Sequence, residues 1–567
     1  MKGNPLQLLN VSIGTIHAVQ IGSEVVKTGF LKRPAPQPWV IDDQGVIGDR
    51  RAVHPDKIYA FARDAYAYWG EHLNVDAAKW PDGFFGENLT LDTLDEDEVR
   101  IGDVFALGND VRLFVAGARN PCHKLAWRLN QPLTFQKTFA RSRRSGMYLG
   151  ILSGGVVQPG DALDCLERDA AMPSVAAVSN MIAEKDPPDL AELCKLLDYS
   201  GLSPGNRIFL SAKRDASERA EHARAGDWEG WRDFVVDHIA DEALDIRSVY
   251  FRSADGKELC GFQPGQFVTV ELPGEDGVIS RCWSLSSFSD NPRQYRLTVR
   301  QQQGRGSRRF HALQPGARVR LRAPAGRFTL NRGSFRPTIL IAAGIGITPL
   351  RSMLDAQLSR PDTPPVYLFY GGRTPESLAF RAELEALAEL HPRFRLITTY
   401  TGARVAGALT GRISSDMVIA ELADLQIEVN GNAHKVPWFE TEMYLCGPKD
   451  FCVSLEAALI QRGANPDRIF LESFSAINAE DSEARVEEAE VRFIRSGVAA
   501  QWTSKEGQSL LELAEAVGIA VPNDCRAGSC LTCRSKLLRG SASVDAGEQT
   551  TLPCIARPTS LVLEMDL

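Results

Sequence analysis

CRAGSCLTC, at residues 525–533, is the stretch that decides the fold at one end of this chain, and a further cysteine follows at position 554. Four residues separate Cys525 from Cys530, two separate Cys530 from Cys533, and Cys554 comes about twenty positions later. Four thiolates at this spacing hold a [2Fe–2S] cluster. A zinc site, which usually shows two C-x₂₋₄-C pairs, and reduced cysteines in a core are the alternatives. The spacing therefore predicts an iron–sulfur centre that transfers single electrons.

Length and composition set the frame for the rest of the sequence. The chain has 567 residues, which corresponds to roughly four domains at about 150 residues each. Its net charge of −8 and the lack of a long basic run argue against nucleic acid or an anionic membrane as a partner. The N-terminus lacks the pattern of a secretory signal, and no run of about eighteen apolar residues occurs. Eleven cysteines suit a reducing compartment, so we expect a cytoplasmic protein.

The first 165 residues read as short strands separated by Gly, Asp and Asn, a pattern typical of a β-barrel. Three polar islands interrupt them: GDRRAVH at 48–54, FGENLT at 85–90 and RNPC at 119–122. In the last island, Cys122 follows a proline and lies near an arginine, which suits a thiolate kept charged by its neighbours. A thiolate is a soft ligand for a transition metal. Cys122 is therefore a candidate metal ligand, and a buried structural thiol is the alternative.

The three islands, followed by GMYLG at 146–150 and PGD at 159–161, resemble the MOSC domain over residues 1–170. Residues 171–225 resemble the helical extension of single-domain bacterial MOSC proteins. In that family the cysteine of the R-x-P-C island ligates molybdenum or carries sulfur, which implies these roles for Cys122. The residues that would line the pterin pocket of a molybdenum cofactor are His54, Glu87, Asn88 and Arg119.

One departure from the MOSC pattern concerns this pocket. Members usually have His-Gly-Gly before Pro-Asp-Lys, whereas this chain runs from His54 directly into Pro55-Asp56-Lys57. Paired glycines often mark a close backbone approach to a ligand. A MOSC fold with an empty pocket is therefore the alternative to a molybdenum site.

Residues 226–332 switch to longer alternating strands, which predict a second β-barrel. The motif RCWS at 281–284 suits a flavin. Arg281 can fork onto a phosphate, Trp283 can lie against the isoalloxazine or ribityl group, and Ser284 can donate a hydrogen bond to flavin N5. An edge-strand arginine with a core tryptophan is the alternative. Four flavin contacts are expected outside the motif: Val299, Gly304, Gly306 and Ser307. The last three lie at a glycine- and serine-rich helix start, which suits the binding of phosphate.

Residues 333–475 alternate strands with helices, which predicts a parallel sheet with ligands at the carboxyl ends of its strands. A buried-type strand at 338–343 runs into GIGITP at 344–349 and then into a helix, so the backbone can approach a pyrophosphate there. Two later strands end in the sequences GGR and CGP. The expected dinucleotide contacts at these turns are Gly344, Gly346, Thr348, Pro349, Arg373, Cys446, Gly447 and Pro448.

Together these two regions resemble the ferredoxin–NADP reductase superfamily over residues 230–475, with Trp283 where the R-x-Y-S motif has tyrosine. The resemblance implies that Cys446 positions the nicotinamide ring and that Phe474 covers the flavin until the dinucleotide arrives. Arg373 would meet a 2′-phosphate, the pyrophosphate or a carboxylate. We expect NADH, with NADPH as the alternative. The order flavin, nicotinamide, ferredoxin resembles reductases of the phthalate dioxygenase type and favours FMN, although no residue decides between FMN and FAD.

Residues 476–487 are rich in Ala, Glu, Asp and Ser and are expected to form a linker that lets the cluster approach two sites in turn. Residues 488–567 place a strand at 491–494 and a helix at 509–517 before the cysteine loop, an order that resembles a β-grasp ferredoxin. The expected fold is therefore multidomain: a MOSC β-barrel with a helical extension, a Greek-key flavin β-barrel, a Rossmann-like α/β nicotinamide domain and a β-grasp ferredoxin.

These features predict an NAD(P)H-dependent oxidoreductase in which hydride reaches a flavin and single electrons pass on to the cluster. The first hypothesis for their destination is a molybdenum cofactor at Cys122 and a small-molecule substrate that is N-hydroxylated or an N-oxide. In the second, the ferredoxin domain serves a separate Rieske-type oxygenase, and the MOSC domain is a docking module or relic. In the third, Cys122 carries a persulfide. The candidate catalytic residues are Ser284, Cys446 and Cys122.

Overall fold

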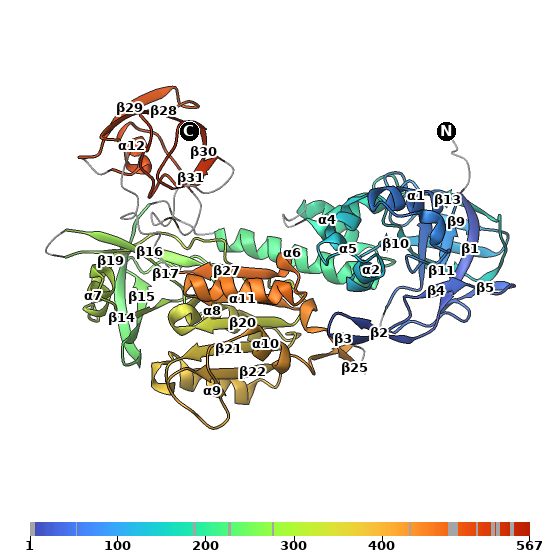
Figure 1. The fold of residues 1–567 in the computed structure, drawn as a ribbon, viewed down its shortest axis with the longest axis horizontal. Coiled ribbons are helices and arrows are strands. Elements are labelled where there is room, and N and C mark those ends of the chain that lie inside the picture. Colours follow the sequence, from blue (N-terminus) through green and yellow to red (C-terminus); the bar gives the residue numbers. More distant parts are fainter. Residues whose placement is uncertain are drawn as a thin grey trace.

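Four structural units follow one another along the chain (Figure 1). A β-barrel (blue) connects through helices to a second barrel (green) and an α/β unit (yellow and orange), and a small sheet (red) stands above the second barrel. The computed structural model describes residues 6–52, 54–184, 189–224, 228, 230–274, 277–429, 432–474, 486–505, 508–522, 528, 533–544 and 549–567. All but the last two residues of the expected linker lie outside the described residues.

The N-terminal unit is a closed barrel of seven strands, which confirms the fold expected from its short strands. The strand order is β13-β9-β10-β11-β7-β8-β1, and pairing of β1 with β13 closes the ring. The strands are β1 (Leu6–Gly14), β7 (Ile58–Ala62), β8 (Leu89–Leu91), β9 (Val104–Leu107), β10 (Val111–Ala118), β11 (Met147–Ser153) and β13 (Ala162–Glu167), and β4 (Lys32–Pro34) flanks β1. Inward side chains such as Val11, Leu113 and Leu149 are fully buried, because alternate residues of a strand face the same side.

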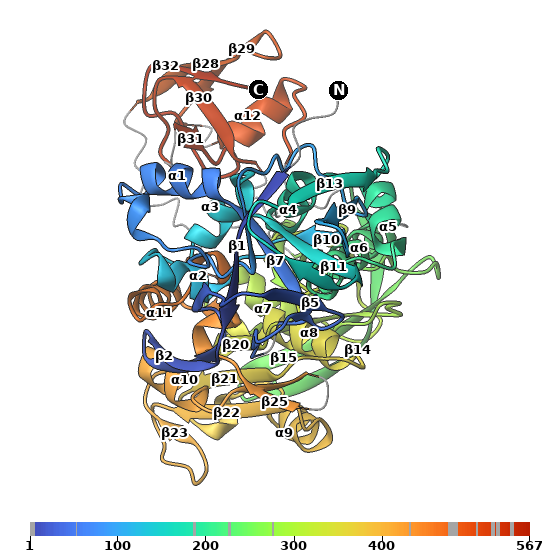
Figure 2. The same ribbon diagram turned by 90° about the vertical axis from the view of Figure 1, so that its right-hand side faces the viewer.

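A hairpin joins this barrel to the α/β unit. Strands β2 (His17–Ile21) and β3 (Glu24–Thr28) project from the barrel and lie beside α10 (Ser415–Glu421) in both views (Figures 1 and 2). Ile21 is buried in one cluster with Trp438 of the α/β unit, and Trp438 Nε1 donates a hydrogen bond of 3.3 Å to Ser23 Oγ. The two units therefore share part of a hydrophobic core.

The expected helical extension follows the barrel. The helices of the first unit and its extension are α1 (Arg63–His72), α2 (His123–Arg128), α3 (Phe135–Arg141), α4 (Val175–Ala183), α5 (Leu190–Asp198) and α6 (Pro204–Arg224). Ser174 and Asp189 cap α4 and α5 by accepting hydrogen bonds from backbone N–H groups of their first turns. Helix α6 runs from the MOSC barrel toward the second barrel (Figure 1). A Cβ at Gly333 would lie 2.4 Å from Ala212 O, so α6 packs directly on the backbone there.

The second barrel is a six-stranded antiparallel sheet in the order β17-β16-β19-β14-β15-β18. Its elements are β14 (Arg232–Ala243), β15 (Ile246–Ser253), β16 (Phe267–Leu272), β17 (Ile279–Ser284), β18 (Tyr295–Arg300), α7 (Arg305–His311) and β19 (Arg318–Leu321). Gly304 is the N-cap residue of α7, so the glycine- and serine-rich segment forms the first turn of this helix.

The α/β unit has a parallel sheet in the order β23-β22-β21-β20-β26-β27, which confirms the predicted nicotinamide fold. Its strands are β20 (Thr338–Ala343), β21 (Val366–Gly372), β22 (Phe394–Tyr400), β23 (Leu409–Thr410), β26 (Glu442–Gly447) and β27 (Ile469–Ser473), and its remaining longer helices are α8 (Ile347–Leu358), α9 (Arg381–Leu390) and α11 (Lys449–Gln461). The hairpin β24 (Gln426–Val429) and β25 (Asn432–Lys435) lies apart from this sheet. The central strands β20 and β26 are parallel, so their carboxyl ends meet at one edge and their amino ends at the other.

The C-terminal unit confirms the expected β-grasp ferredoxin. Its elements are β28 (Glu488–Phe493), β29 (Val498–Thr503), α12 (Leu510–Ala516), β30 (Ser535–Arg539), β31 (Thr550–Thr551) and β32 (Val562–Met565). The first strand begins three residues before the expected Val491, since Ala489 is also buried in the core. Ser509 and Glu512 form a capping box at the start of α12. No helix in the described part of the chain is both long and apolar enough to cross a membrane.

Candidate functional site

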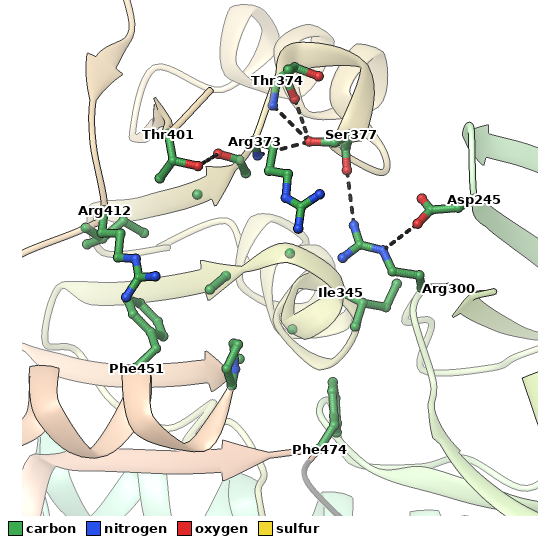
Figure 3. A pocket seen from close by; sticks show the side chains of 18 of the residues that line it. Asp245, Arg300, Ile345, Arg373, Thr374, Ser377, Thr401, Arg412, Phe451 and Phe474 are labelled. Carbon is green, nitrogen blue, oxygen red and sulfur yellow. Dashed lines mark hydrogen bonds and ion pairs between the residues drawn. The ribbon is translucent and has the colours of Figure 1, made fainter. Parts of the chain in front are cut away.

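A cavity of about 930 Å³ opens at the carboxyl ends of β20, β21 and β26 (Figure 3). Gly344 has a φ of +58°, and a Cβ at Gly346 would lie 2.2 Å from Cys446 O. Glycine suits both positions, because one needs left-handed backbone and the other leaves no room for a side chain. The backbone of this turn can therefore approach a pyrophosphate beside the start of α8.

The structure brings six of the expected cofactor contacts to this cavity. They are Gly344, Gly346, Arg373, Gly447, Pro448 and Phe474. Phe474 has 45% of its surface exposed, and its ring faces the cavity (Figure 3), which leaves it available for stacking on a planar ligand.

Three other expected contacts do not line the cavity. Thr348 is buried, and its Oγ1 donates a 3.1 Å hydrogen bond to Ile345 O at the start of α8. Pro349 is buried in the same helix. Cys446 has no exposed surface, and burial raises the pKa of its thiol well above the usual range. Their side chains pack within the domain, so these residues can shape the cavity only through the backbone.

Sequence reasoning missed several polar residues of this cavity. Arg300 Nε lies 3.2 Å from Asp245 Oδ2 within the flavin barrel, and Arg300 Nη2 donates a 3.4 Å hydrogen bond to Ser377 O of the nicotinamide unit. Arg412, which follows β23, points into the cavity beside Arg373, which the sequence had predicted there, and neither has an ion-pair partner in the described part of the chain (Figure 3). Thr401 adds a hydroxyl between them. Because two unpaired guanidinium groups attract phosphate, arginines at strand ends were the signal that could have found them.

The expected flavin residues gather at edge strand β17 and at the start of α7. Arg281 is exposed, and its stem crosses Gly306, where a Cβ would lie 2.8 Å from Arg281 Cγ. The Trp283 ring packs against Phe310 with 4.7 Å between centroids. Ser284 is buried at the end of the same strand. The motif therefore offers one exposed cation and one half-buried ring from alternate positions of the same strand.

The side chains of two further expected flavin residues are engaged in contacts within the flavin barrel. Ser307 Oγ accepts a 3.0 Å hydrogen bond from Gln302 N and has Gln302 O and Gly304 O as acceptors within 3.1 Å, which closes the turn before α7. Val299 is buried in the barrel core and cannot contact a ligand through its side chain. Gly304 is exposed and remains accessible at the N-cap.

A buried carboxyl lies under the dinucleotide cavity. Glu472 pairs with Cys446 across β26 and β27, and its Oε2 has no hydrogen-bond partner among the described residues. Burial raises the pKa of Glu472 to about 8. The side chain therefore holds a proton near neutral pH close to the strand end that forms the cavity.

A second cavity, of about 410 Å³, lies where the MOSC barrel meets the α/β unit. The expected pocket residues that line it are His54, Asn88, Arg119 and Cys122. The opposite wall comes from other parts of the chain, namely Phe209 of α6 together with Phe335, Arg336 and Glu440. The pocket is therefore composite, which the sequence did not reveal.

Arg119 is the distinctive side chain of this composite pocket. It is 6% exposed, and its Cζ lies 4.3 Å from the ring centroid of Tyr59 and 5.7 Å from that of Phe30. Its Nε has no hydrogen-bond partner, and no carboxylate forms an ion pair with it in the described part of the chain. A buried cation without an anion is costly. The site is therefore suited to an anionic ligand.

His54 and Glu87 occupy different positions relative to this pocket. His54 Nε2 lies 3.0 Å from Tyr148 Oη. Desolvation, together with Arg119 and other nearby cations, lowers the pKa of His54 below its usual range, although 48% of the side chain is exposed, and this favours the neutral ring. Glu87 does not line the pocket as expected: it is fully buried behind it, where its Oε1 accepts a 2.8 Å hydrogen bond from Gly83 N.

A buried ion network fixes the nicotinamide domain against the MOSC pocket. His123 Nδ1 lies 3.1 Å from Glu440 Oε1, and Arg468 Nη1 donates to Glu440 Oε2 over 2.8 Å. Arg336 also binds this carboxylate, and Arg468 Nη2 contacts Gln136 Oε1 at 3.2 Å. Burial alone would raise the pKa of Glu440, but Arg468 and Arg336 outweigh it and hold the pKa well below the usual range. Glu440 therefore remains charged.

Two of the four expected cluster ligands can be placed. Cys533 and Cys554 are buried in one hydrophobic cluster of the ferredoxin unit, although they are 21 positions apart in sequence. Cys525 and Cys530 lie outside the described residues. The assignment of all four as ligands stays a prediction.

Four domain families match the chain in order. Residues 48–164 match the MOSC domain, residues 233–330 the oxidoreductase FAD-binding domain, residues 340–456 the oxidoreductase NAD-binding domain, and residues 494–559 the 2Fe-2S iron-sulfur cluster binding domain. The matches define the class as an oxidoreductase that joins a MOSC domain to FAD-binding, NAD-binding and 2Fe-2S cluster binding domains.

Relatives match parts of this arrangement. A flavohemoprotein of Burkholderia sp. (strain TH2) is 32% identical over 45% of this chain and 62% of its own. The reductase subunit Stc4 of stachydrine N-demethylase from Rhizobium meliloti is 28% identical over 56% of this chain and 91% of its own. The solved structure of phthalate dioxygenase reductase covers 60% of this chain and 98% of its own with 24% identity and a TM-score of 0.45. The chain spans less than two thirds of the length of three flavohemoproteins that it resembles.

Proposed function

We propose that this chain is a self-contained reductase in which electrons from NADH pass through FAD and the [2Fe–2S] cluster to a molybdenum cofactor in the MOSC pocket. The substrate is an N-hydroxylated compound or an N-oxide. For an N-oxide the reaction is R₃N–O + 2 e⁻ + 2 H⁺ → R₃N + H₂O, and NADH supplies the electron pair. The observation that carries the proposal is Arg119, a buried cation without an anionic partner beside the Cys122 thiol.

The residues of the pocket fit a molybdenum cofactor. Among the described residues no group of three His, Cys, Asp or Glu side chains could hold a bare metal ion. A metal at Cys122 must therefore bring further ligands of its own, as a pterin-bound metal does. Cys122 would supply a thiolate, and Arg119, with Lys32 and Arg51 in the same wall, would hold the anionic part of the cofactor. When bound, the cofactor supplies oxygen-atom transfer at the N–O bond.

The remaining residues have binding and positioning roles in this proposal. The turn at Gly344 and Gly346 holds the dinucleotide pyrophosphate, and Arg373 lies at its edge. Arg281 and Trp283 hold the flavin phosphate and ring system, and the match to an FAD-binding family favours FAD over FMN. The flavin converts hydride into single electrons, and the cluster carries them one at a time.

A second candidate is a reductase for a separate oxygenase, with the MOSC domain as a docking module. The likeness to the Stc4 reductase subunit favours it, since that protein is named as the reductase part of a demethylase. Full cytochrome c reduction by a protein that contains no molybdenum and consumes no N-oxide would support this candidate.

The test is metal analysis of the purified protein combined with NADH-dependent consumption of pyridine N-oxide. We expect molybdenum to be present and the N-oxide to be reduced. Cys122→Ala should abolish both molybdenum binding and N-oxide reduction but leave NADH-dependent cytochrome c reduction intact. The exposed Cys165 offers a matched control, because Cys165→Ala removes a thiol of the same barrel outside the pocket. Wild-type protein that lacks molybdenum and N-oxide reduction contradicts the proposal.

A further inference from the structure

A third cavity, of about 520 Å³, lies where three units meet. Helices α4 and α6 of the MOSC extension form one wall, and the flavin-barrel segment 261–264 forms another. The connection 330–336 and Phe470 of the nicotinamide domain complete it. No dinucleotide, flavin or cluster residue expected from the sequence lies in its wall. The cavity is therefore separate from the sites already described for these cofactors.

Three residues line both this cavity and the MOSC pocket: Phe209, Phe335 and Arg336. The rings of Phe209 and Phe335 meet edge to face, with 4.7 Å between centroids and 88° between planes. Phe335 is 37% exposed, whereas Arg336 is fixed by its ion pair with Glu440. The two cavities therefore adjoin at Phe209, Phe335 and Arg336. We call these three residues the partition.

The character of the third cavity is aromatic. Its walls contain Phe209, Phe262, Phe335 and Phe470. Several charged groups in the wall are already neutralised within the protein: Asp290 pairs with Arg332, Glu184 with Arg141, and Arg468 with Glu440. The rest of the lining is mixed and includes the charged residues Lys213, Glu442 and Asp467. A cavity of this size with four phenylalanine rings among polar groups suits a small organic ligand with an aromatic body and polar substituents. Ring faces favour aromatic groups in particular.

We propose that the two cavities together form an extended substrate site. The N–O group of the substrate lies in the MOSC pocket near Cys122, and an aromatic body of at least two rings passes Phe209 and Phe335 into the three-unit cavity. The substrate class is therefore an N-oxide or N-hydroxy compound with an extended aromatic substituent. The reaction at the N–O group in this inference rests on the proposed function, whereas the binding of the aromatic body in the two cavities does not. Phe209 and Phe335 determine substrate specificity.

The experiment compares pyridine N-oxide with 4-phenylpyridine N-oxide on the full-length protein. Isothermal titration calorimetry measures binding, and NADH consumption measures turnover. We expect 4-phenylpyridine N-oxide to bind about tenfold more tightly, because the second ring gains aromatic contacts. Phe335→Ala and Phe209→Ala should each remove most of this advantage, so that the two compounds bind these variants with similar affinities. Phe335→Tyr should retain it, and Leu390→Ala, at a side chain that is 71% exposed elsewhere, should have no effect.

The outcomes separate this inference from the proposed function. If 4-phenylpyridine N-oxide binds with the expected dependence on Phe335 but is not reduced, the extended site stands and the proposed reaction fails. If both compounds are reduced and bind with equal affinity, and neither alanine variant changes the ratio of their dissociation constants, the reaction stands and the extended site is overturned. Failure of both compounds to bind wild-type protein also overturns the extended site. Thermal unfolding of each variant checks that the partition residues are not required for folding.

Discussion

The dinucleotide cavity and the MOSC pocket lie at opposite ends of the same two strands. The carboxyl ends of β20 and β26 lead into the turns at Gly344 and Gly447, which line the first cavity. Arg336 and Glu440, each two residues before the amino end of one of these strands, line the second. One domain supplies most of the first site, whereas the second needs the MOSC barrel, its helical extension and the nicotinamide domain together.

This difference has a consequence for electron flow. Each central strand has six residues, which at about 3.3 Å per residue separates its two ends by roughly 20 Å. The sheet itself contains no redox group, so a carrier outside it must connect the two ends. In the proposed relay this role falls to the ferredoxin unit, which stands above the flavin barrel in Figure 1.

The largest effect is expected from removing a cluster ligand, which breaks the connection between the two ends. Cys554→Ser should lower NADH-dependent cytochrome c reduction by about a hundredfold or more, because a [2Fe–2S] cluster needs all four thiolates. Flavin reduction by NADH should continue at the wild-type rate. Visible absorption and stopped-flow kinetics measure the two quantities. Normal cluster absorption in this variant would show that Cys554 is not a ligand.

The next largest effect concerns the charged contact that holds the second site together. Glu440→Ala leaves Arg336 and Arg468 buried without their carboxylate, which costs about 3–5 kcal/mol in comparable buried pairs. We expect the free energy of unfolding of the nicotinamide unit to fall by this order, as measured by urea denaturation. Glu428→Ala, at an exposed position of the same unit, is the control. Equal stability of the two variants would mean that the network contributes nothing to the interface.

Arg119 provides a sharper test of the second site alone. Arg119→Gln removes the buried cation without emptying the space, so the molybdenum content of the purified protein should fall by about tenfold to a hundredfold. Arg119→Lys should restore part of it. Dinucleotide binding at the other end of the strands should be unchanged, as measured by titration with NADH. Wild-type molybdenum content in Arg119→Gln would remove the main support for an anion site here.

More of the dinucleotide cavity than of the MOSC pocket could be predicted from the sequence, and the reasons are physical. Glycine turns such as Gly344 and Gly346 depend on neighbouring residues in the chain, so their motif was readable. The burial of the Cys446 and Thr348 side chains could not be predicted, because a motif gives position along the chain but not which way a strand or helix residue points. Phe335, one of the residues that close the MOSC pocket, could not be predicted, since its contacts depend on how separate units pack.

A smaller effect should appear in the dependence of stability on pH. The pKa of Glu472 is raised to about 8 by burial, so the folded state binds its proton more tightly than the unfolded chain, whose glutamate pKa is about 4.5. Stability should therefore fall as the pH rises from about 4.5 to 8. Glu472→Gln should remove this contribution, on the order of 2 kcal/mol after allowance for partial exposure. Urea denaturation at pH 5 and pH 8 measures it, and parallel profiles for the two proteins would contradict it.

The smallest effect is expected at the exposed arginines of the dinucleotide cavity. If Arg373 contacts the pyrophosphate, which NADH and NADPH share, Arg373→Gln should raise the KM of both about fivefold and leave kcat unchanged, because a uniform binding contact is lost. Steady-state kinetics with both nucleotides measures this, and Arg404→Gln, an exposed arginine outside the cavity wall, is the control. A rise confined to NADPH would instead place Arg373 at the 2′-phosphate. The nucleotide site would then distinguish NADPH from NADH by an exposed arginine at its rim. In the composite pocket, by contrast, the cation proposed to hold an anion is the buried Arg119.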